Sequence, residues 1–207
     1  MEILGGIMKV IAILNQKGGV GKTTLSINIA RALQKGEFNV VLVDADPQGS
    51  ARDWNDANDG KVLPVLGLDR KSLPADIKNI TGFDFAIVDG APQTKELAIA
   101  AIKAADVVLI PVQPSSLDIW ATNDLLSLIQ ERQEMTDGKQ PKAAFIVSRQ
   151  IQNTTVGHEV RTVLAESGIK VFDSGTFQRI AYSSIMTTGK TVFESQDDKA
   201  IDEIIKI

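Results

Sequence analysis

The stretch KVIAILNQKGGVGKTTLSINIARALQKG (9–36) decides the fold of this chain. It opens with KVIAIL (9–14), a short apolar run with β-branched residues, which predicts a buried strand. It closes with Leu25, Ile29 and Leu33 at four-residue spacing before Gly36, which predicts a helix that ends at the glycine. Between them lies the glycine-rich turn NQKGGVGKTT (15–24). A strand, a glycine-rich turn and a helix in this order are typical of a phosphate-binding loop.

The turn carries the groups that a nucleotide phosphate needs. Its three glycines lack a Cβ atom, so the backbone can turn tightly and point successive N–H groups inward. The following helix adds partial positive charge at its N-terminus. We expect Lys22 to reach the β- and γ-phosphates, Thr23 to ligate Mg²⁺ through its hydroxyl, and Thr24 to contact the α-phosphate. The sequence therefore predicts ATP and Mg²⁺ as cofactors.

The rest of the chain repeats the alternation of strand and helix. Further strands are predicted at 39–47, 83–92, 106–114, 142–148 and 168–176, with helices at 94–104, 115–134 and 154–167. Region 50–82 is expected to hold two short helices around a weak strand at 62–66. Because the strands are continuously apolar, we expect helices on both faces of a doubly wound, mostly parallel α/β sheet in a single domain at 8–207. Residues 1–7 are interpreted as an N-terminal extension or an alternative start.

Composition excludes several classes of function. The 207 residues contain no cysteine and one histidine, which removes disulfides, thiolate or iron–sulfur sites and histidine-based metal sites. The net charge is −4 without a lysine or arginine block, so nothing global indicates nucleic-acid binding. No apolar run approaches the ~20 residues that span a bilayer. We therefore expect a cytoplasmic protein.

Acidic residues follow two of the predicted strands. VVLVDAD places Asp44 and Asp46 at the end of one strand, and FAIVD places Asp89 at the end of another. Ligands of open α/β sheets bind outside the carboxyl ends of the strands, where the phosphate loop also begins. An acid at such a strand tip typically holds Mg²⁺ through water, so Asp89 is the expected magnesium partner.

Four motifs together resemble those of ParA-type partition ATPases. Residues 17–23 match K-G-G-x-G-K-[ST], a deviant Walker A loop, and residues 44–49 match D-x-D-P-Q-G. FAIVDGAP (85–92) resembles the third motif, and GKTV (189–192) the late G-K-[ST]-[VI]. The resemblance covers about 8–195. It indicates the small form of this family, which lacks an N-terminal helix-turn-helix domain.

The resemblance implies roles for particular residues. In this family the extra lysine, here Lys17, reaches across a nucleotide-sandwich dimer, the second acid Asp46 positions the attacking water, and Asp44 supports the magnesium shell. Phe177 and Arg179 stand where relatives contact adenine. The implied catalytic residues are Lys17, Lys22 and Asp46; the nucleotide-binding residues are Lys17, Gly18, Gly19, Val20, Gly21, Lys22, Thr23, Thr24, Phe177 and Arg179; and the metal-binding residues are Thr23, Asp44 and Asp89. The implied reaction is slow, Mg²⁺-dependent hydrolysis of ATP to ADP and phosphate.

The family also implies partners. We expect an ATP-bound homodimer that binds DNA without sequence preference, associates with the nucleoid and segregates a plasmid or chromosome. A small centromere-binding adaptor of the ParB or ParG kind is expected to stimulate hydrolysis. Candidate DNA contacts are Arg149, Arg161, Lys170, Arg179 and Lys190.

Alternatives remain open at this point. Iron-protein and arsenite-pump relatives need cysteines, and the tyrosine kinases need a tyrosine cluster that a chain with one tyrosine lacks. The tail SQDDKAIDEIIKI (195–207) is too acidic for a MinD-like membrane helix and is expected to pack on the body, so we expect no membrane contact. The same switch can instead position a non-DNA cargo, such as a carboxysome or chemoreceptor cluster, or a membrane-site cargo. A metabolic ligase such as dethiobiotin synthase shares the loop, but Lys17 and D-x-D-P-Q argue against it.

Overall fold

The computed structural model describes residues 7–92, 94–152, 154 and 156–207. Apart from Ile7, which is exposed, the expected N-terminal extension lies outside the described residues. The elements are β1 (Lys9–Ile13), α1 (Lys22–Lys35), β2 (Val40–Ala45), α2 (Ser50–Asp56), β3 (Val65–Gly67), α3 (Leu73–Lys78), β4 (Phe85–Gly90), α4 (Lys95–Ala104), β5 (Val107–Val112), α5 (Ser116–Trp120), α6 (Asn123–Glu134), β6 (Lys142–Gln150), α7 (Val156–Ala165), β7 (Lys170–Phe177), α8 (Ile180–Met186), the 3₁₀ helix η1 (Val192–Glu194) and α9 (Asp198–Ile205).

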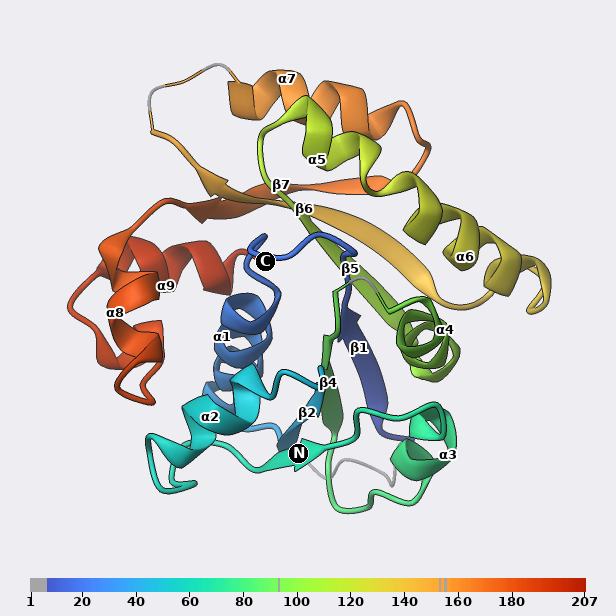
Figure 1. Ribbon diagram of the computed structural model, residues 1–207. Coiled ribbons are helices and arrows are strands. Elements are labelled where there is room, and N and C mark those ends of the chain that lie inside the picture. Colours follow the sequence, from blue (N-terminus) through green and yellow to red (C-terminus); the bar gives the residue numbers. More distant parts are fainter. Residues whose placement is uncertain (1–6, 93, 153, 155) are drawn as a thin grey trace.

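The strands form one seven-stranded sheet in the order β3-β2-β4-β1-β5-β6-β7 (Figure 1). Each neighbouring pair is parallel, which confirms the predicted doubly wound sheet. The chain starts in the middle, at β1, whose two neighbours are β4 and β5. The chain builds the sheet first to one side of β1 and then to the other. The turn after β1 therefore lies at the topological switch point, where ligands of such sheets bind.

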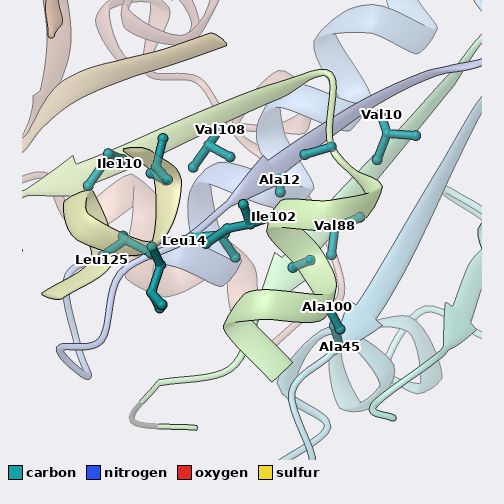
Figure 2. Close-up of a cluster of buried hydrophobic side chains, with 14 of the residues drawn as sticks. Val10, Ala12, Leu14, Ala45, Val88, Ala100, Ile102, Val108, Ile110 and Leu125 are labelled. Atoms are coloured by element: carbon teal, nitrogen blue, oxygen red, sulfur yellow. The ribbon is translucent and has the colours of Figure 1, made fainter. Parts of the chain in front are cut away.

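Helices cover both faces of the sheet (Figure 1). Along β1, Val10 and Ala12 face one core, while Ile13 faces the other. The first core packs under α3, α4, α6 and α7, and Figure 2 shows its side chains between the sheet and α4 and α6. The second core packs under α1, α2, α8 and α9. This two-sided burial explains why the strands are continuously apolar in sequence.

The expected helix at 115–134 is wrong in one respect, because the structure divides it into α5 and α6. The break falls at Ala121 and Thr122. The Thr122 hydroxyl donates a hydrogen bond to the Ile119 carbonyl at 2.6 Å, a local bond that competes with helical geometry. The weak strand predicted at 62–66 is also shifted, since β3 begins at Val65. The helix α8 was not predicted.

The late motif GKTV binds the C-terminal segment to two helices. The Trp54 indole of α2 donates to the Lys190 carbonyl at 2.8 Å, and the Val192 amide donates to Asn28 Oδ1 of α1 at 2.8 Å. Gly189 has a φ of 63°, and a Cβ there would lie 2.7 Å from Asn58. The GKTV motif therefore has a structural role, which does not depend on a bound ligand.

The acidic tail packs on the body, as expected from its charges. Ala200 and Ile204 of α9 are buried in the second core. Among the described residues, no helix is both long and apolar enough to cross a membrane.

Candidate functional site

The phosphate-binding loop lies at the carboxyl end of β1 and leads directly into α1. Gly19 and Gly21 have φ values of 77° and 93°, a left-handed backbone that favours glycine. A Cβ atom at Gly18, Gly19 or Gly21 would meet no atom within 4 Å. The space beside these three glycines is therefore open.

Lys22 occupies the first position of α1 and is 7% exposed. Its ammonium donates to the Lys17 carbonyl at 2.9 Å, so one loop lysine fixes the backbone of the other. Burial lowers the pKa of Lys22, and the nearby carboxylates of Asp89 and Asp46 oppose that shift. The ammonium thus lies at the loop, with both acids near enough to act on its pKa, and a bound phosphate would give it a further negative partner.

Three side chains from neighbouring strand ends hold the loop. Gln113 Nε2 and Arg149 Nη1 both donate to the Gly19 carbonyl, at 2.8 and 2.9 Å, and Ser148 Oγ donates to the Val20 carbonyl at 2.9 Å. These contacts fix the two carbonyls on the side of β5 and β6. Sequence reasoning did not assign them this role, although the strand-end rule points to these positions.

Asp89 is buried beneath the loop at the end of β4 and is 1% exposed. Its Oδ1 accepts from the Ser26 hydroxyl at 3.1 Å, and its Oδ2 has no partner among the described residues. Burial raises the pKa of Asp89 to about 7, the charge of Asp44 adds to that rise, and the hydroxyls of Thr23 and Ser26 and the Lys22 ammonium oppose it. A buried carboxylate oxygen without a donor is a position that a cation would satisfy.

Asp44 is the direct neighbour of Asp89 across the β2–β4 pair and is fully buried. Both of its oxygens already accept hydrogen bonds from the chain. Oδ1 accepts from the Asp46 amide at 3.1 Å, and Oδ2 accepts from the amide and Nε of Arg52 at 3.0 and 3.3 Å. The structure thus gives Asp44 a different set of partners from the magnesium shell that the sequence predicts.

Asp46 lies at the cleft itself. It is 9% exposed, it lines the cleft beside Lys22 and Thr23, and its Oδ1 accepts from the Gln48 amide at 3.0 Å. Asp46 therefore lies beside the phosphate loop, and its water-positioning role stays a prediction.

The residues present fit a hydrated magnesium ion better than a protein-caged metal. Within 7–92, 94–152, 154 and 156–207, no cluster of three or more His, Cys, Asp or Glu side chains is arranged to hold a metal. Mg²⁺ in nucleotide sites typically takes one or two protein oxygens and leaves the rest to phosphates and water. The Thr23 hydroxyl and Asp89 Oδ2, which has no partner among the described residues, are the candidates for such oxygens.

The loop opens into a cleft of about 1060 Å³ that runs toward the start of α8. The predicted residues that line it are Gly18, Gly19, Gly21, Lys22, Thr23, Thr24, Asp46, Phe177 and Arg179. Lys17, Val20, Asp44 and Asp89 were also predicted but lie outside this lining. The cleft brings the loop together with the C-terminal segment, more than 150 residues away along the chain.

Arg179 lines the cleft, but its guanidinium already has acidic partners. It lies 2.6 Å from Glu203 and 3.8 Å from Asp197, and its side chain is 14% exposed. Glu203 also accepts from the Phe177 amide at 3.0 Å and from the Tyr182 hydroxyl at 2.9 Å. Burial and the charge of Glu203 raise the pKa of Tyr182. The α9 carboxylate therefore shapes the far side of the cleft, where the ring of Phe177, the other predicted base contact, lies 5.9 Å from the Arg179 guanidinium.

Lys17 points away from the cleft toward α5. Its ammonium pairs with Asp118, which is 1% exposed, while the Lys17 side chain is 43% exposed. The sequence did not indicate this partner.

The predicted DNA contacts differ in their surroundings. Arg149 donates to Gly19, Arg161 donates to Gln150 Oε1 at 2.9 Å, and Arg179 is paired as above, so these three already bind groups of the chain. Lys170 lies over the Phe172 ring, and Lys190 is exposed beside α2.

Comparison with known proteins agrees with this arrangement. Residues 11–192 match the family described as CobQ/CobB/MinD/ParA nucleotide binding domain. The chain is 33% identical over 206 residues to the maintenance of carboxysome distribution protein A of Halothiobacillus neapolitanus, covering 95% of this chain and 93% of that protein. It is 30% identical over 190 residues to a ParA protein of Rhizobium radiobacter, covering 88% and 84%.

A solved structure of the Cyanothece McdA–ATP complex has the same fold, with a TM-score of 0.78. The match covers 97% of this chain and 95% of the McdA chain, and the sequences are 18% identical.

Proposed function

The chain belongs to the CobQ/CobB/MinD/ParA nucleotide-binding domain family, a family of ATPases, and from this we propose that it is an ATP-driven switch that distributes a cargo by forming a sandwich dimer. In this proposal two copies enclose two ATP molecules, the dimer binds DNA without sequence preference, and hydrolysis releases it. ATP complexes among structures of the same fold support the choice of nucleotide.

The observation that carries this proposal is that the two loop lysines, Lys17 and Lys22, lie in different surroundings. Lys22 is buried at the start of α1, beside the loop of its own subunit, where a lysine can hold the phosphates that any ATPase must bind. Lys17 is half-exposed and turned away from its own cleft, so its charge is available to a second subunit once it leaves Asp118. A second copy would thereby complete each phosphate site.

Hydrolysis in this proposal relies mainly on position and charge. Thr23 and Asp89 would hold the magnesium ion, which when bound neutralises phosphate charge. Lys22 would bind the β- and γ-phosphates, and the Asp46 carboxylate would orient the attacking water. The described lining of the cleft contains no histidine that could act as a general base. The Asp46 carboxylate is a weaker base than an imidazole. Slow turnover is the expected result.

We propose DNA as the surface on which the switch works and a plasmid or chromosome as its first candidate cargo. The four family motifs and the ParA relative support this choice. A small centromere-binding adaptor of the ParB or ParG kind would stimulate hydrolysis and release the dimer.

Positioning of a protein assembly is the second candidate. The relative from Halothiobacillus neapolitanus, matched over nearly the whole chain, is described as a carboxysome distribution protein. The same ATP-gated dimer serves this cargo if the adaptor sits on the assembly instead of on a centromere. A MinD-like membrane site is less well supported, because Ala200 and Ile204 of α9 are buried in the second core.

The decisive test measures DNA binding in the presence of ADP and of ATP at several salt concentrations. ATP-gated binding that weakens steeply with salt is expected, because phosphate contacts release counterions. Turnover of ATP without any DNA binding would instead favour a metabolic ligase. Deleting the gene then separates the two cargoes: replicon loss indicates DNA partition, and clustered protein assemblies with stable replicons indicate assembly positioning.

A further inference from the structure

Arg52 joins the two acids of the D-x-D-P-Q-G segment to each other and to a third acid. It lies in α2, six residues after Asp46, and its side chain is 38% exposed. Its amide and Nε both donate to Asp44 Oδ2, and its Nη2 donates to the Asp46 carbonyl at 2.9 Å and to Asp69 Oδ2 at 3.0 Å. Three of these four hydrogen bonds end on this segment, and the fourth ends on Asp69.

The backbone of Asp46 is held on both sides by this arrangement. Its amide donates to Asp44 Oδ1, and its carbonyl accepts from Arg52. The backbone from which the Asp46 side chain projects is therefore held by Asp44 and Arg52, while the side chain itself accepts from the Gln48 amide. The chain also makes room for the guanidinium, since a Cβ at Gly67 of β3 would lie 3.1 Å from Arg52 Nη1.

The buried charge of Asp44 also indicates that Arg52 holds this segment in place. Asp44 is fully buried, and a buried carboxylate without a cation carries a large desolvation cost. Arg52 is its ion-pair partner in this structure, and the planar guanidinium can serve several acceptors at once, which an ammonium cannot do with the same geometry. Arg52 is not part of the cleft lining, so it has no direct contact with a nucleotide there.

We propose that Arg52 is a positioning residue for ATP hydrolysis, which holds Asp46 in the orientation needed for the water and keeps Asp44 out of the magnesium shell. This inference rests on the proposed ATPase function. It assigns Asp44 a structural role as the anchor of Arg52 and leaves Thr23 and Asp89 as the protein oxygens for magnesium. Asp69 is the outer anchor that stops the guanidinium from swinging away.

The test compares Arg52→Ala with wild type in turnover and in ATP affinity. A catalytic group displaced by about 1 Å can cost ~100-fold in rate, so we expect turnover to fall at least ~10-fold. ATP affinity should change less than ~3-fold, because the phosphate loop keeps its own contacts. Arg70→Ala is the matched control, since Arg70 pairs with Asp76 on the surface and should leave both quantities unchanged.

Two further variants separate positioning from mere charge and from folding. Arg52→Lys keeps the charge but cannot bridge the three acceptors, and we expect turnover close to that of Arg52→Ala. Asp69→Asn keeps Arg52 and Asp44 and weakens only the outer anchor, so it serves if Arg52→Ala does not fold. A turnover reduced about 2-fold or more at unchanged affinity is expected for it. Wild-type turnover in Arg52→Ala and Asp69→Asn, full recovery by lysine, or parallel loss of affinity would each overturn the proposal.

Hydrogen exchange supplies a readout that does not depend on hydrolysis. Without nucleotide, the amides of Asp46 and residue 52 should exchange at least ~10-fold faster in Arg52→Ala than in wild type, because both donate to Asp44, and the guanidinium that holds Asp44 and the Asp46 carbonyl is lost. Unchanged exchange overturns this inference. A wild-type protein that fails to hydrolyse ATP overturns the proposed function instead, and the exchange result still decides whether Arg52 holds the segment.

Discussion

The ammonium of Lys17 is paired with the carboxylate of Asp118, which lies 101 residues further along the same chain. Asp118 is buried, and its second oxygen has no partner among the described residues. A lysine that leaves this carboxylate to reach a second subunit therefore leaves a buried charge behind. In the proposed dimer, this pair would link dimer formation to the environment of α5.

Lys17→Ala should still bind ATP and should lose ATP-dependent dimerisation, because the charge that completes the opposite phosphate site is gone. Size-exclusion chromatography with ATP and with ADP checks this. Dimers formed as readily as in wild type would remove the cross-subunit role. The substitution also strips Asp118 of its partner, so we expect a loss of about 1–3 kcal/mol in unfolding free energy. The double variant Lys17→Ala, Asp118→Asn restores that stability without restoring dimerisation.

Lys22→Ala should weaken ATP binding by about 100-fold or more, close to 3 kcal/mol. The ammonium is buried beside the loop and beside Asp46 and Asp89, so no solvent cation replaces it at the phosphates. Calorimetric titration with a non-hydrolysable ATP analogue measures the loss. Lys35→Ala, at the exposed end of α1, is the control and should bind as wild type does. Wild-type affinity in Lys22→Ala contradicts the phosphate assignment.

Asp46→Ala should bind ATP with near wild-type affinity and accumulate dimer, because removal of the water-orienting carboxylate blocks hydrolysis and not assembly. The turnover should fall at least ~100-fold, a range seen when a positioned catalytic group is removed. Chromatography with ATP gives the dimer fraction and phosphate release gives the rate. A purely monomeric variant in ATP would rule out the water-positioning role.

Asp89→Asn should alter stability in a pH-dependent way. The folded-state pKa of Asp89 is about 7, above the ordinary 3.8, so the folded protein holds a proton there that the unfolded chain has lost. The wild type therefore loses stability as pH rises from about 4 to about 7, and the neutral asparagine does not. Urea unfolding without nucleotide or magnesium should find the variant more stable at pH 8, on the order of a few kcal/mol, with a smaller difference at pH 5. A difference that does not change with pH would show that Asp89 ionises normally.

Gly189→Ala should destabilise the fold by about 2–4 kcal/mol, since the new Cβ would strike Asn58 and the φ of 63° disfavours alanine. Gly168 has a similar φ of 76°, and a Cβ added there would meet no atom within 4 Å, so Gly168→Ala measures the backbone cost alone. Thermal unfolding of both variants isolates the steric part. Equal destabilisation of the two would show that GKTV does not hold the C-terminal segment against α2.

Much of the fold was predictable because its signals are local. The apolar runs before Asn15, Asp44 and Asp89 each end in a polar residue, and a parallel sheet brings such strand ends to one edge. The break between α5 and α6 was not predictable in this way, because no glycine or proline marks it; Thr122, at the break, donates its hydroxyl to the Ile119 carbonyl. The position of β3 depends on pairing with β2, which the weak apolar pattern of 62–66 does not specify.

The residues of the candidate site likewise fall into those that the sequence predicts and those that it does not. The phosphate loop, with Lys22 and Thr23, is a contiguous motif, so its geometry follows from glycine conformations and from the start of α1. Ion-pair partners carry no such motif signal, whether they are distant, as Asp118 is from Lys17 and Glu203 from Arg179, or only eight residues away, as Arg52 is from Asp44.

By itself, the sequence determined the α/β class, the phosphate loop, its two lysines and the acids at the strand tips, because each depends on residues adjacent along the chain. Only the tertiary structure decided which charges meet. It directed Lys17 to Asp118, occupied both oxygens of Asp44, and left Asp89 Oδ2 without a donor among the described residues. The physical reason is that ion pairs and buried hydrogen bonds depend on distance in space. Chain packing brings together residues that lie far apart in the sequence, such as Lys17 and Asp118, which are 101 positions apart.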